Sequence, residues 1–384
     1  MIKACALTDK GIEKVALIEL DEIIKVKGVA EERVVIFEPK SEDDLLRFCY
    51  KSQSCQRVLL LFDQIVFSDY EDFLKKAEAI IDKLDLKEWL REDSSFRVSC
   101  ERLGEHDFGS NTAEQEIGGL IIKAAKDKLG FEPAVKLESS ELIFYIFVNG
   151  ERAYLGLDLI GRDLSKRQYR IFSSPGIINA NLAYAMVCLS GYKKKERLVD
   201  FFCKSGIICI EAALMNSGIS ISHYNKDFAF KKIRKFERDW DEFFKKADAK
   251  NSPEPQDILG LDPILRNIEA SKKNAKLAGV DKLIIFSKMD LDWLDTKLNE
   301  KSVNVVISRI PCPSKHLAES AVKKTYKELF YQAEFFMKKK GRLCLLAEST
   351  TLLKEMIDDK FELASEEELW AGKQIYHFVT IIKK

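Results

Sequence analysis

The alternation of hydrophobic and polar positions divides the chain into two parts with different secondary structure. In the first part, short apolar runs such as Val34-Val-Ile-Phe37 predict strands, whereas residues 112–128 place apolar side chains on one helical face. Thr112 is the expected N-cap of that helix, because Gln115 follows three residues later. Residues 95–101 alternate with a period of two, which is typical of a half-buried strand. We therefore expect an α+β fold here.

After about residue 170, apolar runs and helical stretches alternate along the chain. Helical patterns follow the first two apolar runs, and Gly279 is expected to end the second helix. This alternation predicts a parallel, doubly wound, Rossmann-like sheet, in which ligands bind beyond the carboxyl ends of the strands. The predicted strands cover residues 198–202, 258–262, 283–286, 303–307, 342–346 and 375–382.

The charge balance limits the possible partners. The 384 residues allow two to three domains at about 150 residues each. Lys and Arg together number 62, and so do Asp and Glu, which gives a formal net charge of zero. A general basic coat for nucleic acid is therefore excluded, and any RNA binding must rest on a local basic surface.

Apolar runs and cysteines bear on the compartment. No apolar stretch approaches the roughly 18 residues of a membrane helix, and the start of the chain lacks the apolar core of a signal peptide. The nine cysteines are scattered without a C-x-x-C pair, which is typical of reduced thiols rather than of metal ligands. We expect a cytoplasmic protein that contacts no membrane and holds no metal.

Polar residues at the predicted strand ends indicate a ligand site. Ser205 and Gly206, in the turn that begins at Asp200, let the backbone approach a ligand. Asp262 ends the second strand, where an acid commonly holds both ribose hydroxyls, and Asp290 after the third strand could accept a hydrogen bond from an adenine amine. Both acids could instead be helix caps. Without a G-x-G-x-x-G sequence, a nucleoside cofactor is favoured over a nicotinamide dinucleotide.

Several local sequences, in this order, resemble one known family. The chain is similar to the THUMP-domain class I RNA methyltransferases, which use S-adenosylmethionine, and within them to the branch that methylates the exocyclic amine of guanine in the tRNA acceptor stem. The resemblance implies a ferredoxin-like region at 1–60, a THUMP RNA-binding domain at 61–158, a linker at 159–176 and a Rossmann-like methyltransferase domain at 177–384. It rests on Phe96 to Ser110 with Glu114 and Gly118, on residues 153–170 and 180–190, and on Phe228-Ala-Phe230 with Trp240.

The cofactor loop departs from the family pattern at one important position. The family sequence D-P-x-C-G-S-G-T is matched at Asp200, Cys203, Ser205 and Gly206, but Lys204 replaces a glycine. Phe201 and Ile207 are further departures. The side chain of Lys204 either narrows the cofactor gap, points to solvent or pairs with the cofactor carboxylate. The resemblance implies that Asp200, Ser205, Gly206, Asp262 and Asp290 bind the cofactor.

The family's catalytic sequence, N-P-P-Y or D-P-P-Y, departs further. Here the fourth strand continues into Ser308-Arg-Ile-Pro-Cys-Pro313, so that Arg309, Ile310 and Cys312 replace the acid or amide, the first proline and the aromatic residue. Arginine has no acceptor for the protons of an amine. A shift by one residue would place the hydroxyl of Ser308 beside the backbone carbonyl of Pro311 as the catalytic acceptors.

Three hypotheses follow from these departures. The protein is an active tRNA (guanine-N2) methyltransferase, a catalytically inactive RNA-binding protein or scaffold, or an enzyme whose site is completed by a protein partner. The expected partner is tRNA in each case. Candidate RNA-binding residues, each of which could instead be a solvated surface charge, are Arg97, Arg102, Lys166, Arg167 and Arg170.

Overall fold

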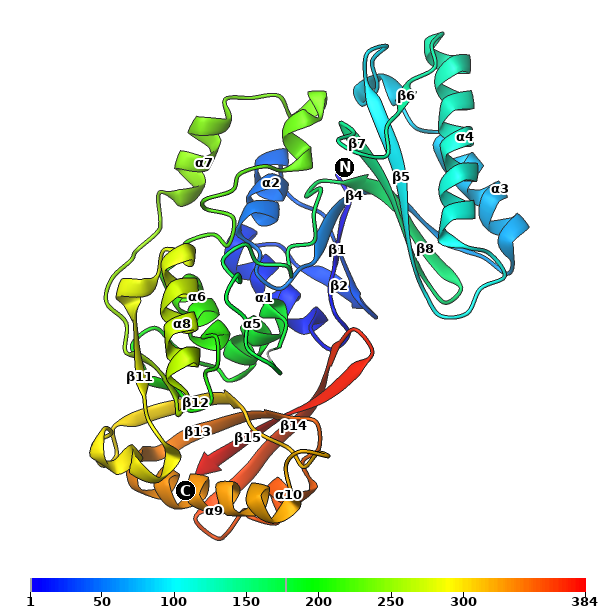
Figure 1. The fold of residues 1–384 in the computed structure, drawn as a ribbon. Coiled ribbons are helices and arrows are strands. Elements are labelled where there is room, and N and C mark those ends of the chain that lie inside the picture. Colours follow the sequence, from blue (N-terminus) through cyan, green and yellow to red (C-terminus); the bar gives the residue numbers. More distant parts are fainter. Residues whose placement is uncertain (1, 177) are drawn as a thin grey trace.

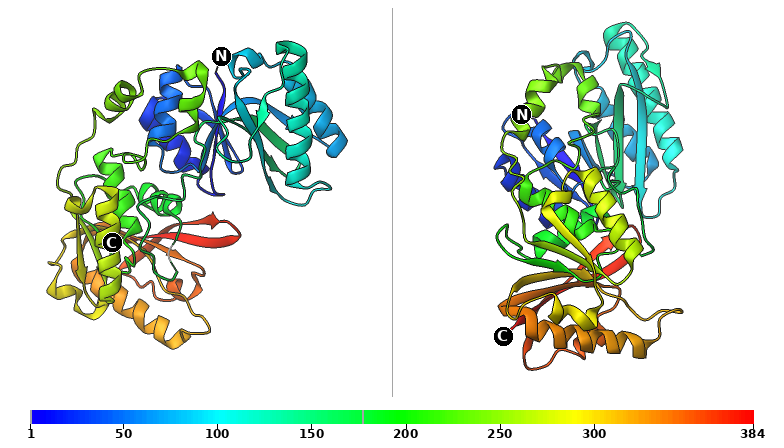
Figure 2. Two further views of the ribbon diagram at one scale, coloured as in Figure 1. Left: turned by 45° about the horizontal axis from the view of Figure 1, so that its top comes forward. Right: turned by 60° about the vertical axis from the view of Figure 1, so that its left-hand side comes forward.

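The computed structural model describes residues 2–176 and 178–384, which form two β-sheets with helices packed against them (Figure 1). The first sheet contains eight strands in the order β2-β3-β1-β4-β8-β7-β5-β6, and the second contains seven in the order β11-β10-β9-β12-β13-β15-β14. In both views of Figure 2, the end of the first sheet that carries β5 and β6 lies away from the second sheet.

The first four strands and two helices form a ferredoxin-like unit, as predicted. Strand β1 lies between β3 and β4 and is antiparallel to both, and β2 pairs with β3 at the edge. The elements are β1 (Ala4–Leu7), α1 (Glu13–Ile24), β2 (Gly28–Glu31), β3 (Val34–Phe37), α2 (Glu42–Lys51) and β4 (Arg57–Val66).

The same sheet continues into a second α+β unit, because β4 also pairs with β8. A hairpin turn at Asn149-Gly150 joins β7 to β8. The prediction that Thr112 caps the long helix is wrong: α4 begins at Ser110, and Gly109 takes the N-cap position with extended backbone. The elements are α3 (Tyr70–Ile81), η1 (Leu86–Glu88), β5 (Ser95–Leu103), α4 (Ser110–Leu129), β6 (Ala134–Val135), β7 (Leu142–Asn149) and β8 (Arg152–Asp158).

The second sheet is Rossmann-like, with β11-β10-β9-β12-β13 parallel. The prediction of a wholly parallel sheet is wrong at one edge, where β15 is antiparallel to β13 and β14 is antiparallel to β15. Its strands are β9 (Leu198–Asp200), β10 (Ile258–Asp262), β11 (Ile284–Lys288), β12 (Val303–Arg309), β13 (Met337–Ala347), β14 (Phe361–Ala371) and β15 (Gln374–Lys383).

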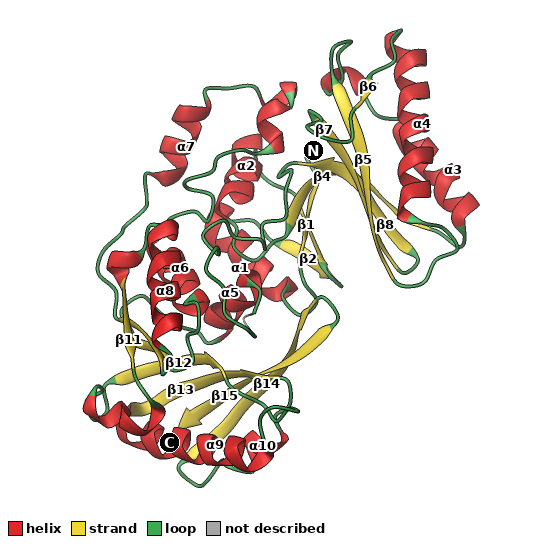
Figure 3. Cartoon of the chain, viewed as in Figure 1, coloured by secondary structure: helices red, strands yellow, loops and turns green. Residues whose placement is uncertain are grey.

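Helices cover both faces of this sheet (Figure 3). Val305 and Ile307 of β12 face a core that includes α5, α6 and α8, whereas Val306 faces the core under α9. Burial on both faces explains why these strands are almost continuously apolar. The helices are α5 (Ala180–Leu189), α6 (Ile207–Ser217), η2 (Ala229–Lys232), η3 (Arg234–Phe236), α7 (Trp240–Asp248), α8 (Leu265–Ala278), η4 (Asp281–Leu283), η5 (Leu291–Thr296), α9 (Glu319–Phe336) and α10 (Thr351–Lys354).

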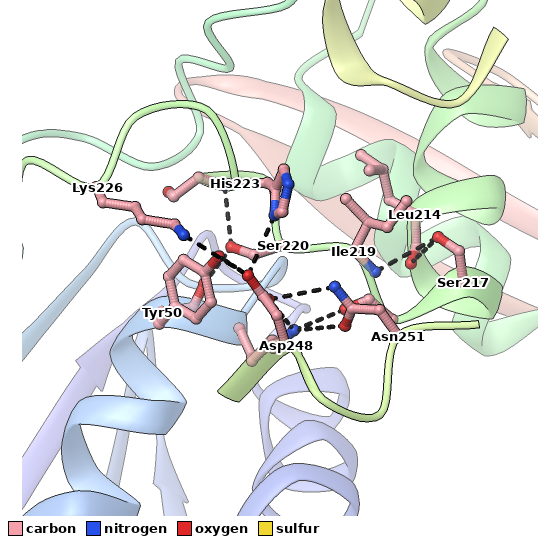
Figure 4. Close-up of polar contacts among 12 residues, drawn as sticks. Tyr50, Leu214, Ser217, Ile219, Ser220, His223, Lys226, Asp248 and Asn251 are labelled. Carbon is pink, nitrogen blue, oxygen red and sulfur yellow. Dashed lines mark hydrogen bonds and ion pairs between the residues drawn. The ribbon is translucent and has the colours of Figure 1, made fainter. Parts of the chain in front are cut away.

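The segment between α6 and β10 packs back on the first half of the chain. Phe228, Phe230 and Phe244 belong to the same core as the first sheet. Asp248 fixes this segment to α2, because its carboxylate accepts a hydrogen bond from the Tyr50 hydroxyl at 2.9 Å (Figure 4). The same carboxylate accepts from Lys51, also at 2.9 Å. Burial opposes ionisation of Asp248, but these bonds and the charge of Lys51 outweigh it and lower the pKa of the carboxyl.

A buried ion pair joins the linker to both halves. The Arg167 Nε and Nη2 atoms lie 2.9 and 3.0 Å from the two carboxylate oxygens of Glu211 on α6. Gln53, from the first half, donates to the same carboxylate at 2.7 Å, and the Tyr169 hydroxyl donates at 2.6 Å. The side chains of the pair are 1% and 0% exposed. Such a pair stabilises the fold only while both partners are present.

Replacing one partner should therefore destabilise the protein strongly. For Glu211→Ala we expect the free energy of unfolding to fall by about 3–5 kcal/mol, because the guanidinium of Arg167 is left buried without a carboxylate. The double variant Arg167→Met/Glu211→Leu should lose less than Glu211→Ala alone. Chemical denaturation measures both. Glu242→Ala, which removes an exposed pair with Lys246 on α7, is the control and should leave the midpoint unchanged. Equal losses for Glu211→Ala and the control would contradict this assignment.

Candidate cofactor and catalytic site

The predicted site residues collect at the carboxyl ends of three adjacent strands. Asp262 ends β10, Asp200 ends β9 and Ser308 lies near the end of β12. Strand β9 lies between the other two, and the chain runs from β9 to β10 on one side and reaches β12 and β13 on the other. This reversal of strand order is the place where open α/β sheets bind ligands.

The turn after β9 has a left-handed backbone at two residues. Gly206 has φ +80°, and a Cβ atom there would lie 2.9 Å from the side chains of Phe286 and Ser271. Lys204 has φ 48°, so it keeps the conformation that a glycine would adopt without strain. The turn is held by Asp262, which accepts from the Lys204 N–H at 3.0 Å, and by Ser271, which donates to the Lys204 carbonyl at 2.8 Å.

Of the three alternatives for Lys204, the structure shows the first: its side chain narrows the space above the turn. Its Nζ atom donates to the carbonyls of Pro175 and Gly176 at 3.1 and 2.8 Å, and Arg309 donates to the same Gly176 carbonyl. Burial and the positive charge of Arg309 lower the pKa of Lys204. The remaining cavity, which Ser205 and these two cations help to line, has a volume of about 20 Å³.

Asp200 is a buried carboxyl whose pKa lies near neutral pH. It accepts hydrogen bonds from the Ser308 hydroxyl at 2.6 Å and from the Phe202 N–H at 3.2 Å. Burial raises the pKa of Asp200 to about 7, although both of these bonds act to lower it, and the charge of Asp262 raises it further. Asp200 thus shares a hydrogen-bond network with the turn and with β12.

Each of the two predicted catalytic acceptors already accepts a hydrogen bond in this structure. The Ser308 side chain is fully buried, and besides donating to Asp200 it accepts from the Phe202 N–H at 3.3 Å. Both of its hydrogen bonds therefore go to Asp200 and to the turn after β9. The Pro311 carbonyl accepts from the Tyr326 hydroxyl on α9 at 2.6 Å, which leaves one of its two lone pairs. Arg309 turns toward Gly176 and pairs with Glu348 at 2.6 Å.

The other two predicted acids differ in their surroundings. Asp262 is buried, and its carboxylate accepts from the Ile264 N–H and the Asn267 amide, both at 2.9 Å, as well as from the Lys204 N–H. It therefore stabilises the turn and the start of α8 and has one acceptor position left. Asp290 is exposed and precedes η5, but its side chain makes no capping hydrogen bond. The structure does not support the alternative that Asp290 is a cap.

One face of α8 holds residues that the sequence reasoning missed. Asn267 accepts from the Ser174 hydroxyl at 2.8 Å, and Asn274 bonds both the N–H and the carbonyl of Phe172, at 3.0 and 2.8 Å. Together with Ser271, these residues follow a spacing of four and three, which places them on one helical face. This row of polar residues on the buried face of α8 is the signal that could have revealed them.

The candidate RNA-binding residues lie in two groups. Arg97 and Arg102 lie on β5, where Arg97 donates to the Leu137 carbonyl at 2.8 Å and Arg102 lies over the Phe108 ring at 5.3 Å. In the linker, Lys166 is exposed, and Arg170 is half-buried with its pKa lowered by burial. Arg167 is a correction: it is 5% exposed and paired with Glu211, so it cannot contact RNA in this fold.

Two further observations concern metals and membranes. Within residues 2–176 and 178–384, no three His, Cys, Asp or Glu side chains group closely enough to hold a metal ion. The described helices include none with the length and apolar character needed to cross a membrane.

Comparisons with protein families agree with this architecture. The model described as "RMKL-like, methyltransferase domain" matches residues 167–376, and the model described as "THUMP domain" matches residues 69–158. The chain is 30% identical over 362 residues to the tRNA (guanine(6)-N2)-methyltransferase of Methanocaldococcus jannaschii, which covers 93% of each chain. It is 24% identical to the enzyme of the same name from Archaeoglobus fulgidus, over 90% of this chain and 83% of the relative.

Solved structures share the fold. SMU.472 in complex with SAH has a TM-score of 0.82 at 21% identity, covering 99% of this chain and 97% of the other. TrmN from Thermus thermophilus has a TM-score of 0.73 at 22% identity, covering 100% of each chain.

The raised pKa of Asp200 predicts a specific pH dependence of stability. In the unfolded chain the carboxyl loses its proton near pH 3.8, whereas in the folded protein it keeps the proton up to about pH 7. Its contribution to stability is complete below pH 3.8 and is lost as the pH rises to about 7. The largest loss that this difference allows is on the order of 4 kcal/mol.

Asp200→Asn removes this titration. Denaturation midpoints across the pH range should shift in favour of the variant between about pH 4 and pH 7, and the difference should be constant above that range. The exposed Asp290→Asn is the matched control and should follow the wild type. A difference between Asp200→Asn and wild type that does not change with pH would show that the carboxyl is ionised throughout.

Proposed function

Because the chain belongs to the family of RMKL-like methyltransferases, we propose that it transfers a methyl group from S-adenosylmethionine to the exocyclic amine of a guanine in tRNA. One observation carries this proposal: the relative that is 30% identical over 93% of both chains is named for that reaction. The THUMP match N-terminal to the methyltransferase match supports it, because this domain order places an RNA-binding unit on the same chain as the transfer site.

The proposed cofactor site is the turn after β9 together with the ends of β10 and β11. Ser205 is fully buried, and its hydroxyl has no hydrogen-bond partner among the described residues, which fits a missing polar ligand. Gly206 leaves no room for a side chain, and the carboxylate of Asp290 makes no capping hydrogen bond to η5. We assign cofactor binding to Asp200, Ser205, Gly206, Asp262 and Asp290. The solved relative with SAH supports a cofactor of this class. When bound, S-adenosylmethionine supplies an electrophilic methyl group.

Cofactor entry requires two side chains to move. Ligand pockets for molecules of this size measure roughly 300–1,000 Å³, whereas Lys204 and Arg309 leave about 20 Å³. Lys204 is held by hydrogen bonds to two carbonyl oxygens, and Arg309 by one such bond and by its ion pair with Glu348. A hydrogen bond from a charged group contributes about 1.5–3 kcal/mol net, so displacing these side chains reduces the apparent affinity for the cofactor.

The acceptor for the guanine amine is assigned to the backbone. The Pro311 carbonyl follows β12 and keeps one lone pair beyond its bond to Tyr326. A positioned acceptor of this kind can orient the amine nitrogen toward the methyl group. Ser308 is a positioning residue in this proposal, because its hydroxyl acts on Asp200 and on the turn.

The RNA is proposed to contact both halves of the chain. A-form RNA is recognised mainly through phosphates and 2′-hydroxyl groups, which suits isolated basic side chains. We assign such contacts to Arg97 and Arg102 on β5 and to Lys166 and Arg170 in the linker. All nine cysteines are free, which fits the reducing conditions of the cytoplasm, where we propose that the protein works.

A methyl-transfer assay tests the proposed function. Unmodified tRNA and methyl-labelled S-adenosylmethionine should yield labelled N2-methylguanosine in the digested RNA. The decisive comparison is the variant Arg309→Asn/Ile310→Pro/Cys312→Tyr, which restores the family's catalytic sequence. An inactive wild type beside an active triple variant would overturn the proposal, because the fold would then be competent and the natural loop not.

Lys204→Gly tests the assigned cofactor site. Removing the side chain frees the gap, so calorimetric titration should show S-adenosylmethionine binding about tenfold tighter, the equivalent of about 1.4 kcal/mol. Lys25→Gly is the matched control, since Lys25 is also left-handed, with φ 54°, at the end of α1. It should leave the affinity unchanged. Weaker binding by Lys204→Gly would show instead that the ammonium group contacts the cofactor.

A further inference from the structure

A second cavity lies far from the strand ends, between β5, the linker and the segment after α6. Its volume is about 290 Å³. Arg97 of β5 is directly opposite Ile143 of β7 in the sheet, and both line the cavity. Arg162 of the linker and Lys232 at the end of η2 also line it. The lining therefore includes residues of the THUMP match, such as Arg97, and residues of the methyltransferase match, such as Lys232.

The cavity collects positive charge that carboxylates do not neutralise. Arg97, Arg162 and Lys232 all line it, and none of them forms an ion pair with a carboxylate in the part of the chain that the structure describes. Arg162 bonds instead to the Ser222 hydroxyl at 2.9 Å and to the Asn225 carbonyl at 3.3 Å, and lies 4.6 Å from the Phe228 ring centre. Burial lowers the pKa of Arg162, although the charges of Asp227 and Asp158 act to raise it. Asp227 also lines the cavity, beside the three basic side chains.

Two buried polar atoms of the wall lack partners. The Ser140 side chain is 5% exposed, and its hydroxyl makes no hydrogen bond within the described residues. The Arg97 Nε–H is likewise buried without an acceptor. An unsatisfied buried donor costs about 1–3 kcal/mol, so two of them on one wall indicate an absent acceptor. Both atoms are covered in this structure, so a ligand with several anionic oxygens would accept from them only after the Ser140 and Arg97 side chains turn toward the cavity.

We propose that this cavity binds a backbone phosphate of the RNA, held by Arg97, Arg162, Lys232 and the Ser140 hydroxyl. The planar guanidinium groups and the hydroxyl match the oxygen geometry of a phosphate. Such a contact would fix the RNA to the THUMP domain and to the methyltransferase half at the same point. This inference rests on the proposed RNA substrate, but not on the identity of the methylated base.

The test uses the full-length protein and unmodified tRNA over a series of salt concentrations. Arg97→Gln/Lys232→Gln should weaken binding about tenfold at low salt and reduce the slope of log K against log salt by about one. The matched control, Lys301→Gln/Lys338→Gln, removes two exposed lysines from the far end of the second sheet and should change neither value. Equal effects in both double variants would overturn the inference.

Ser140→Ala distinguishes binding in the cavity from a general effect of positive charge on RNA affinity. It removes a hydroxyl without changing the charge, so we expect tRNA binding to weaken severalfold with the salt slope unchanged. Unaltered binding by both Ser140→Ala and Arg97→Gln/Lys232→Gln would refute the site. Arg162 is left intact because it also holds the backbone around Asn225.

A titration with inorganic phosphate tells whether the cavity takes free phosphate or a phosphate group of the RNA backbone. If millimolar phosphate raises the melting temperature of the wild type but not of Arg97→Gln/Lys232→Gln, and tRNA binding is equal in both, the cavity takes free phosphate and the RNA assignment is overturned. Loss of methyl transfer in the wild type would refute the proposed function and leave the tRNA-binding result to decide the cavity.

Discussion

The buried carboxylate of Glu211 is the constraint on which the relation between the two halves depends. A fully buried charge must be paired, and this one is satisfied only by Arg167 and Tyr169 of the linker and by Gln53 of the first half. Because Glu211 lies on α6, the helix that begins directly after the cofactor turn, the pair also fixes the linker beside that turn. The same linker then supplies the carbonyl that Lys204 and Arg309 share.

The turn after β9 contains a residue whose backbone conformation is unfavourable. A left-handed lysine costs about 1–2 kcal/mol relative to the ordinary conformation, yet Lys204 is held there by bonds to its own backbone N–H and carbonyl. These bonds come from Asp262 and Ser271, which belong to β10 and α8. The backbone conformation of the turn is therefore set by Asp262 and Ser271. Lys204, which stands where the family sequence has glycine, changes the space above the turn but not the path of its backbone.

The sequence predicted the elements better than the contacts of charged side chains. Continuous apolar runs identified the central strands, since both of their faces are buried. Strand β14 was missed because it lies at the sheet edge and its sequence is rich in exposed glutamates, without a run of apolar residues. Arg167 was expected at the surface, and its burial could not be foreseen because its partner Glu211 lies 44 positions away on another element. Ser308 was expected to face the substrate, and its bond to Asp200 could not be foreseen because the two residues are 108 positions apart. Neither pairing leaves a local pattern.

Because the chain has no net charge, basic residues without a carboxylate partner are a better guide to the RNA contacts than the total number of basic residues. With no net positive charge, the chain cannot attract RNA over its whole surface, so affinity must come from a few contacts. Many basic residues are already engaged: on the THUMP domain, Lys123 pairs with Glu78 and Lys126 with Glu132. A paired lysine must give up its carboxylate before it can bind a phosphate. Cations whose bonds go to neutral carbonyls, as those of Arg97 and Arg162 do, keep their full charge for a ligand, and the RNA path is expected to follow them.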